Sequence, residues 1–241
     1  MTFAYEFRWS VLWQHPYGEW MLQGIWTTLT LGTICWFSAL FLGIIVGTCR
    51  VAPWKPLRIL ATVYTEFFRD IPLLVQLFFW YFAAPRVLPA AIEQYLYRQV
   101  PNAEFWVVVI ALSIYTSSRV AEQIRSGLQS IPQDQFFAAL STGLTHFQMY
   151  RYVTIPLAIR IMIPPLTTEF LTTFKNTSLA MTVGVLEATF MSQQIEAYTF
   201  RGLEATTGAC LVYLVITMMV VLLMGFVEKK LAVPGLIARG R

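Results

Sequence analysis

Residues 206–227 read TTGACLVYLVITMMVVLLMGFV, a run without any charged side chain that is followed by Glu228-Lys229-Lys230. About 20 apolar residues are needed for a helix to cross the hydrocarbon core of a bilayer. This run therefore predicts a transmembrane helix. The composition of the whole chain agrees, because 57% of the 241 residues are hydrophobic and only 12% are charged. A soluble domain with a solvated surface does not have these values, so the bilayer is the expected solvent.

Two apolar segments near the N-terminus predict further helices. Residues 24–49 are long enough to span the bilayer. Residues 57–70 carry four charged side chains, whose burial at the bilayer centre is costly, and Pro72 interrupts the helix that follows. We interpret 57–70 as an interfacial or protein-covered helix that breaks near Pro72 and continues as a span through residues 71–84.

The middle of the chain adds two more spans. One covers residues 105–117 and extends to Gly127, and another covers 153–184, where three prolines and several polar residues interrupt the apolar run. With 206–227 the count is about five, so we expect an all-α polytopic membrane protein with one transmembrane domain over residues 1–241. Residues 185–200 are mixed in polarity and predict an amphipathic helix on the outer face.

Lysine and arginine are distributed unevenly between the two sides of these spans. Cytoplasmic loops of membrane proteins carry an excess of both. One side holds Arg50, Lys55, Arg58, Arg125, Arg151, Lys229, Lys230, Arg239 and Arg241, and the other holds Arg8, Arg86, Arg98 and Arg201. This predicts an outside N-terminus and a cytoplasmic C-terminus. It also explains the net charge of +4 without a nucleic-acid partner.

The first predicted span contains the small-residue run Gly43-Ile44-Ile45-Val46-Gly47. Such a run lets a second helix approach closely. Glycines are also common in spanning helices, so chance remains the alternative.

The connection between the third and fourth spans, residues 134–152, is cytoplasmic in this orientation. Its apolar residues recur at three and four positions, which predicts an amphipathic helix. Asp134 is a possible cap at the start, and Gly143 suits a helix end, because glycine readily adopts a positive backbone angle. We expect a helix, a turn at Gly143 and a second helical piece that reaches Arg151.

Several polar side chains fall inside the predicted spans, where they indicate a water-lined path or an internal ion pair. They are Arg119 and Glu122 in the third span, and Thr168, Glu169, Thr172, Asn176 and Thr177 in the fourth. Arg119 and Glu122 lie three residues apart, a spacing at which the two charges can neutralise each other. Both interpretations of Arg119 stay open at this point.

Three sequence motifs, in this order along the chain, resemble the polar amino-acid permeases of ABC importers. They are Glu66-Phe67-Phe68-Arg69-Asp70-Ile71-Pro72-Leu73-Leu74-Val75-Gln76, Glu122-Gln123-Ile124-Arg125-Ser126-Gly127-Leu128-Gln129-Ser130-Ile131-Pro132, and Lys175-Asn176-Thr177-Ser178-Leu179. In addition, Ala138-Ala139, Gly143 and Ile155-Pro156 resemble the cytoplasmic signature of binding-protein-dependent importer membrane subunits. Phe137 stands where that signature has glutamate.

The resemblance implies a type I ABC importer permease (MetI-like) fold in the inner membrane of a bacterium. It implies that residues 134–152 form the coupling helix that contacts the ATPase. The contact residues would be Phe136, Phe137, Ala138, Ala139, Leu140, Gly143 and Leu144. With Phe137 in place of the acid, we expect the contact to be more apolar than charged.

The resemblance also implies the partners. These are two ABC ATPase subunits, a sibling permease or a second copy of this chain, an extracytoplasmic amino-acid-binding protein and the lipid bilayer. The sequence has no Gly-x-x-x-x-Gly-Lys-[Ser/Thr] run, so ATP and Mg²⁺ would be used by the partner ATPase. We expect no catalytic residue, metal site or bound cofactor in this chain.

The cargo is suggested by Arg119. By resemblance, many polar amino-acid permeases have an aromatic residue at this position, whereas this chain has an arginine. A guanidinium binds a carboxylate in a two-pronged geometry. The stretch Ser118-Arg119-Val120-Ala121-Glu122-Gln123 resembles the permeases of the glutamate/aspartate system. The hypothesis is an acidic amino acid, with other polar or basic amino acids as alternative cargo. An ion-coupled secondary transporter or a channel is the alternative class of function.

Overall fold

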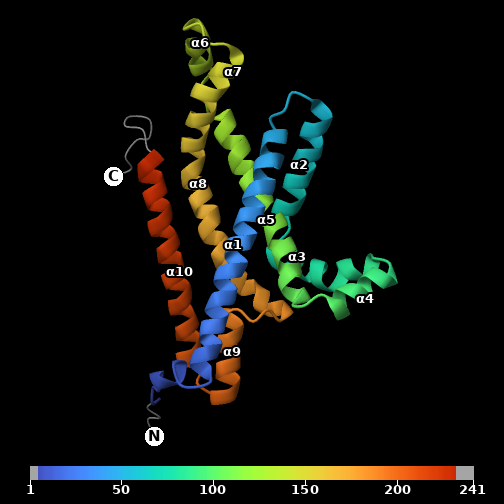
Figure 1. The fold of residues 1–241 in the computed structure, drawn as a ribbon, viewed down its shortest axis with the longest axis vertical. Coiled ribbons are helices and arrows are strands. Elements are labelled where there is room, and N and C mark those ends of the chain that lie inside the picture. The colour runs from blue at the N-terminus through green and yellow to red at the C-terminus, as the bar shows by residue number, and fades with distance from the viewer. Residues whose placement is uncertain (1–4, 232–241) are drawn as a thin grey trace. The chain divides into compact units, whose positions relative to one another are not determined.

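The computed structural model describes residues 5–231, which form helices and connecting turns (Figure 1). Arg239 and Arg241, used in the orientation argument, lie outside these residues. In chain order the elements are η1 (Trp9–Leu12), α1 (Tyr17–Cys49), α2 (Lys55–Asp70), α3 (Leu73–Phe78), η2 (Phe79–Ala83), η3 (Ala84–Val87), α4 (Ala90–Gln99), α5 (Ala103–Gln129), α6 (Gln133–Ser141), α7 (His146–Met149), η4 (Tyr150–Thr154), α8 (Ile155–Asn176), η5 (Thr177–Val183), α9 (Ala188–Thr199) and α10 (Gly202–Leu231).

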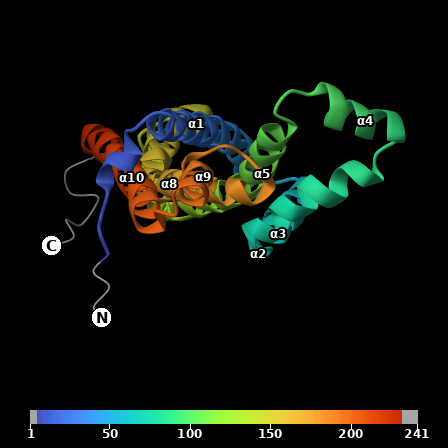
Figure 2. The same cartoon turned by 90° about the horizontal axis from the view of Figure 1, so that it is seen from below.

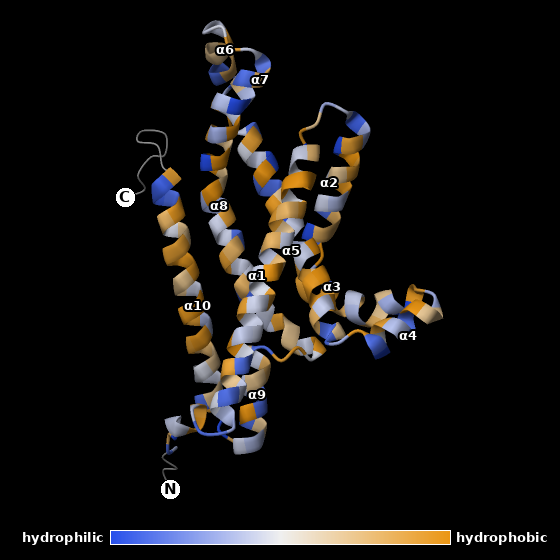
Figure 3. Ribbon diagram, viewed as in Figure 1, coloured by the Kyte–Doolittle hydropathy of each residue, from blue (hydrophilic) through white to orange (hydrophobic). Residues whose placement is uncertain are grey.

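Helices lie at all five predicted spans. By length and apolar composition α1, α5 and α10 can each cross a membrane, and α2 with the segment from Leu73 to Val87 makes a fourth, bent candidate. Helix α10 is hydrophobic over most of its length (Figure 3). Helix α8 has 22 residues, so it reaches about 33 Å and matches the bilayer core in length. Because α8 carries several polar side chains, it is not among the helices that qualify as spans by apolar composition.

The predicted break at Pro72 is confirmed. Helix α2 ends at Asp70, and Ile71 is extended with φ −87° and ψ 129°, the conformation that a following proline favours. The chain then turns by 101° before the next helical segment. That segment is not the single helix expected to Ala84, because α3 ends at Phe78 and a π-helical turn follows. Helix α4, which was not expected, lies beyond it and is joined by a loop to α5 (Figure 2).

The prolines that interrupt the apolar run of the fourth span do not end its helix. Helix α8 continues through Pro164 and Pro165. Proline removes a backbone donor, yet spanning helices tolerate it where neighbouring groups satisfy the freed carbonyls. The regular helix ends at Asn176, and a 3₁₀ helix continues to Gly184, which has φ 86°.

The chain packs as two compact units. Unit 1 comprises residues up to 37, 72–113 and 172–218, and unit 2 comprises 38–71, 114–171 and the residues from 219 onward. The core of unit 1 includes Leu31, Leu77, Leu112 and Ile195, all less than 2% exposed.

The N-terminal segment of unit 1 is attached to the start of α10. The amide of Arg8 donates a hydrogen bond of 2.8 Å to Glu204 Oε1, and the Tyr5 hydroxyl donates to the same carboxylate. The hydrogen bond that the Tyr5 hydroxyl donates to Glu204 raises the pKa of Tyr5. Glu204 is thereby fully buried with hydrogen-bond partners.

The amphipathic segment at residues 185–200 is helical, as predicted, but it is packed into unit 1 instead of lying alone on a face. Glu187 caps α9 by accepting from the amides of Thr189 and Phe190 at 2.9 and 2.8 Å, and it also accepts from the Tyr213 hydroxyl at 2.5 Å. The Ala188 amide donates to Thr28 Oγ1 at 3.1 Å. These contacts attach α9 to α1 and α10.

In unit 2, the end of α1 lies directly against α5. A Cβ added at Gly47 would be 2.6 Å from Ile124 Cβ and 2.8 Å from the Ala121 carbonyl oxygen. The close-packing interpretation of the Gly43–Gly47 run is therefore confirmed. Helix α2 is joined to α5 by a hydrogen bond of 2.7 Å between Tyr64 Oη and Ser117 Oγ.

The segment between α5 and α8 has the predicted helix, turn and helix. Helix α6 covers Gln133–Ser141, Gly143 has φ 87°, and α7 begins after Thr145, which forms a capping box with Gln148. The interpretation of Asp134 as the cap of this helix is wrong. Pro132 occupies the N-cap position. Asp134 lies in the first turn, where its negative charge interacts favourably with the positive end of the helix dipole.

Candidate functional site

Arg119 on α5 and Glu169 on α8 form a two-pronged ion pair in unit 2. Arg119 Nε lies 2.7 Å from Glu169 Oε2, and Arg119 Nη2 lies 3.0 Å from Glu169 Oε1. The Arg119 side chain is 35% exposed, whereas that of Glu169 is 4% exposed. A buried carboxylate requires a cation and hydrogen bonds to offset its lost hydration. Arg119 supplies both, and part of its guanidinium stays accessible.

Of the two interpretations left open for Arg119, the pairing with Glu122 is not the arrangement in the structure, where Arg119 binds Glu169. Glu122 is bound by other arginines: Arg50 Nη1 lies 2.6 Å from Oε2, and Arg125 Nη2 lies 2.5 Å from Oε1. Arg119 lies three residues before Glu122 and Arg125 lies three residues after it. Glu122 pairs at this spacing with Arg125, the one on its C-terminal side. Arg119 is then available to Glu169, whose position on α8 the local sequence does not reveal.

The remaining path candidates are divided between the two units. Thr168, in unit 2, is exposed. Thr172, Asn176 and Thr177 belong to unit 1. Thr177 is fully buried, and its hydroxyl donates 2.7 Å to the Phe174 carbonyl, so it serves the backbone at the start of η5. The structure brings Arg119 and Glu169 together within unit 2.

Arg50 is a site residue that the sequence did not identify. Its side chain is 7% exposed, and besides Glu122 it binds Glu66 Oε1 through Nη2 at 2.8 Å. Arg69 binds the other oxygen of Glu66 at 2.8 Å. We call the five residues Arg50, Glu66, Arg69, Glu122 and Arg125 the arginine–glutamate network. In the sequence Arg50 shows only as one basic residue at the end of a span.

The predicted ATPase-contact residues lie on a short helical segment next to α8 (Figure 1). Phe137 is 63% exposed, and Phe147 on α7 is 76% exposed. Phe136 instead faces the segment itself, with its ring centroid 6.5 Å from that of Tyr150. Ala139 is buried and Gly143 forms the turn, so these two shape the segment. The exposed surface of the segment therefore has two large aromatic side chains, Phe137 and Phe147, among polar ones, and position 137 has no carboxylate.

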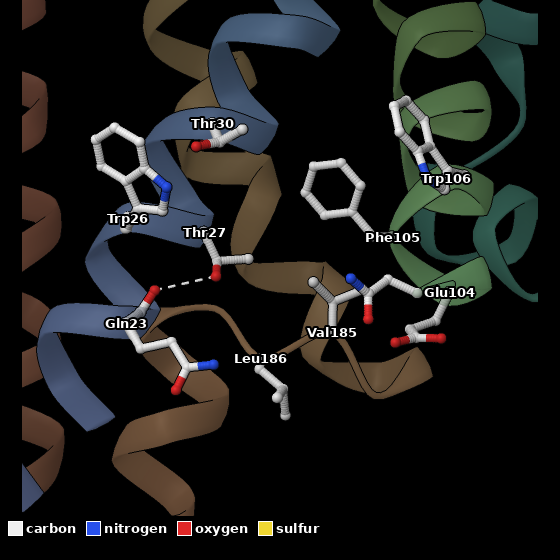
Figure 4. Close-up of a pocket in the computed structure, with 10 residues that line it drawn as sticks. Gln23, Trp26, Thr27, Thr30, Glu104, Phe105, Trp106, Val185 and Leu186 are labelled. Atoms are coloured by element: carbon white, nitrogen blue, oxygen red, sulfur yellow. Dashed lines mark hydrogen bonds between the residues drawn. The ribbon is translucent and has the colours of Figure 1, made fainter. Parts of the chain in front are cut away.

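Unit 1 contains a separate pocket of about 310 Å³ between α1, the start of α5 and the loop before α9 (Figure 4). Its polar lining comes from Gln23, Thr27, Thr30, Asn102 and Glu104, and its aromatic lining from Trp26, Phe105 and Trp106. The predicted orientation puts this end of α5 on the outer side. Mixed polar and aromatic walls of this size suit a small molecule or a side chain.

Comparison with known proteins gives one family and consistent relatives. Residues 39–233 match the model of the family described as binding-protein-dependent transport system inner membrane component. The chain is 35% identical over 238 residues to the glutamate/aspartate import permease protein GltJ of Escherichia coli (strain K12), covering 95% of this chain and 97% of that protein. It is 29% identical to the glutamine transport system permease protein GlnP of the same strain, with 95% and 99% covered.

A solved structure agrees with the fold. The crystal structure of an amino acid ABC transporter with histidines has a chain that is 30% identical and superimposes with a TM-score of 0.76. The match covers 89% of this chain and 95% of that one.

Proposed function

Since the chain belongs to the binding-protein-dependent transport system inner membrane components, we propose that it is the permease subunit for an acidic amino acid, glutamate or aspartate. The chain is an amino-acid ABC importer permease, and ATP hydrolysis takes place in a separate subunit of such systems. What the proposal adds is the cargo, the path residues and the contact with the ATPase.

The observation that carries the choice of cargo is the Arg119–Glu169 pair. A guanidinium that already holds one carboxylate in two-pronged geometry at 2.7 and 3.0 Å has the donors that a substrate carboxylate needs. An acidic amino acid has a second carboxylate to offer. We propose that it competes with Glu169 for Arg119 during passage, so that Glu169 holds the guanidinium in place between transport events. The similarity to a glutamate/aspartate permease supports the same cargo.

The α6–α7 segment is proposed as the contact with the ATPase. Its exposed aromatic side chains, Phe137 and Phe147, offer an apolar anchor for a groove, as short amphipathic helices do in other complexes. Its helices and capped turn make it stiff enough to transmit a displacement to α5 and α8. Assembly would comprise two ATPase subunits, a second permease subunit and an extracytoplasmic binding protein, and access to the path would alternate.

Other amino acids are the competing cargo, because the glutamine permease relative covers as much of the chain at 29% identity. The competing proposal differs in one respect, since an uncharged side chain has no second carboxylate for Arg119. Neither cargo changes the role proposed for the α6–α7 segment.

Uptake into proteoliposomes tests the proposal. The complex is reconstituted with its binding protein, with ATP inside or outside the vesicles, and labelled aspartate, glutamate, glutamine and arginine are compared. We expect uptake of aspartate and glutamate only with ATP on the ATPase side and with the binding protein present. Uptake driven by an ion gradient alone would contradict the mechanism, and preference for glutamine or arginine would contradict the cargo.

A further inference from the structure

Arg50 connects two sequence motifs whose role the proposed function does not explain. Glu66 and Arg69 belong to one motif on α2, and Glu122 and Arg125 belong to the other on α5. Each glutamate binds the arginine three residues later in its own helix. Arg50, at the end of α1, donates from Nη2 to the first glutamate and from Nη1 to the second, at 2.8 and 2.6 Å.

The network is placed between helices that are already in close contact. Below Arg50, Gly47 of α1 leaves no room for a Cβ beside Ile124 of α5. Tyr64 of α2 is hydrogen-bonded to Ser117 of α5. The end of α1, helix α2 and the second half of α5 are therefore held together by packing and by charge within unit 2 (Figure 1).

The α6–α7 segment follows this three-helix body closely in the chain. Helix α5 ends at Gln129, and α6 begins at Gln133. Ile131 in the short connection is buried, and Gly127 lies tightly against Met162 of α8. A displacement of α6 is thus delivered to α5 one to two turns from Glu122. Helix α5 also carries Arg119, one turn before Glu122, which binds Glu169.

From this arrangement we propose that Arg50 is a positioning residue for energy coupling. By binding Glu66 and Glu122 together, it makes α1, α2 and α5 move as one body when the α6–α7 segment is displaced. Arg50 contacts no substrate in this role. Lysine cannot replace it fully, because a single ammonium does not present the planar fork that reaches two carboxylates on different helices. The proposal rests on the ATPase contact proposed for α6–α7.

The test compares Arg50→Lys and Arg50→Met with Arg58→Met in the complete reconstituted complex. Arg58 is exposed on α2, and its side chain has no ion pair with any of residues 5–231. For each variant, ATP hydrolysis and amino-acid uptake are measured with the substrate-loaded binding protein. We expect the number of amino acids transported per ATP to fall about tenfold in both Arg50 variants, equivalent to about 1.4 kcal/mol. The basal rate of ATP hydrolysis of complexes with either Arg50 variant should stay close to that of the unmodified complex. Arg58→Met should leave both the rate of hydrolysis and the transport per ATP unchanged.

A double-mutant comparison separates coupling from folding. Glu66→Gln should reduce transport per ATP in the same direction. Arg50→Met already removes the Arg50–Glu66 pair, so adding Glu66→Gln should lower transport per ATP by less than Glu66→Gln does alone. An unchanged ratio of transport to hydrolysis in both Arg50 variants would overturn the proposal, and so would failure of both to assemble, which would show a purely structural role. If the proposal that α6 contacts the ATPase is incorrect, the result is different: the ATPase stays bound after the α6 face is altered.

Discussion

Arg119 and Glu169 bind each other with two hydrogen bonds across α5 and α8, although 50 residues separate them in the chain. The pair places an accessible cation over a buried anion, with 35% and 4% of the side chains exposed. The proposed path for amino acids has a charge of each sign at this point, and the two charges can be tested separately.

Arg119→Ala should reduce uptake of aspartate and glutamate at least tenfold. Hydrogen bonds to charged groups contribute about 1.5–3 kcal/mol, which corresponds to roughly 10–100-fold in affinity. Initial uptake rates in proteoliposomes, measured over a range of substrate concentrations, provide the check. Arg119→Lys should be intermediate.

Glu169→Gln is the matched control for that change, because it breaks the same pair and keeps the guanidinium. We expect it to retain uptake of acidic amino acids. Unchanged uptake in Arg119→Ala would remove the substrate role. Equal loss in Arg119→Ala and Glu169→Gln would mean that the pair serves the fold alone.

Phe137→Asp combined with Leu140→Asp should abolish co-purification of the ATPase. The change puts a charge at exposed Phe137 and another at half-buried Leu140, and burying an unpaired charge in an interface is costly. Affinity purification through a tag on the permease gives the measurement. Tyr198→Asp, at an exposed aromatic position on α9, should leave the ATPase bound. Retention of the ATPase by the double variant would exclude α6 as the contact.

Gly47→Ala should lower the stability of the purified protein by about 1–3 kcal/mol, the usual effect of inserting a methyl group into a filled interface. The new Cβ would lie 2.6 Å from Ile124 Cβ and 2.8 Å from a backbone oxygen, which cannot move aside easily. Gly225→Ala on α10 has no atom within 4 Å of its Cβ, so the better helix propensity of alanine should be neutral or favourable. Thermal unfolding in detergent compares them. A tolerated Gly47→Ala would mean that α1 and α5 separate more readily than their contact suggests.

Phe200→Gly should raise stability by about 1 kcal/mol, because a residue other than glycine is strained in the left-handed conformation. Phe200 ends α9 with φ 56° and is 89% exposed, so little packing is lost. Phe200→Ala keeps the strain and should show no such gain. A thermal midpoint that is equal for the two variants would contradict this explanation.

The elements that could be predicted are those set by local pattern. Helix α10, the break at Pro72 and the turn at Gly143 each follow from apolar length, a missing donor or a permitted backbone angle. The partner of Arg119 could not be predicted, because it depends on which face of α8 meets α5. Arg50 was missed for the same reason: its two acids are 16 and 72 residues away in the chain. Helix α4 has a short, weakly apolar sequence that gives no span-like signal.

The 101° turn after α2 has a consequence for the surroundings of the protein. Within a bilayer, the ends of two half-length helices present backbone amides and carbonyls that hydrocarbon cannot satisfy. At bilayer depth, the backbone groups at Ile71 and Pro72 therefore need cover from protein or contact with water instead of lipid tails. The break thus marks a part of the protein surface that is not expected to contact the surrounding lipid.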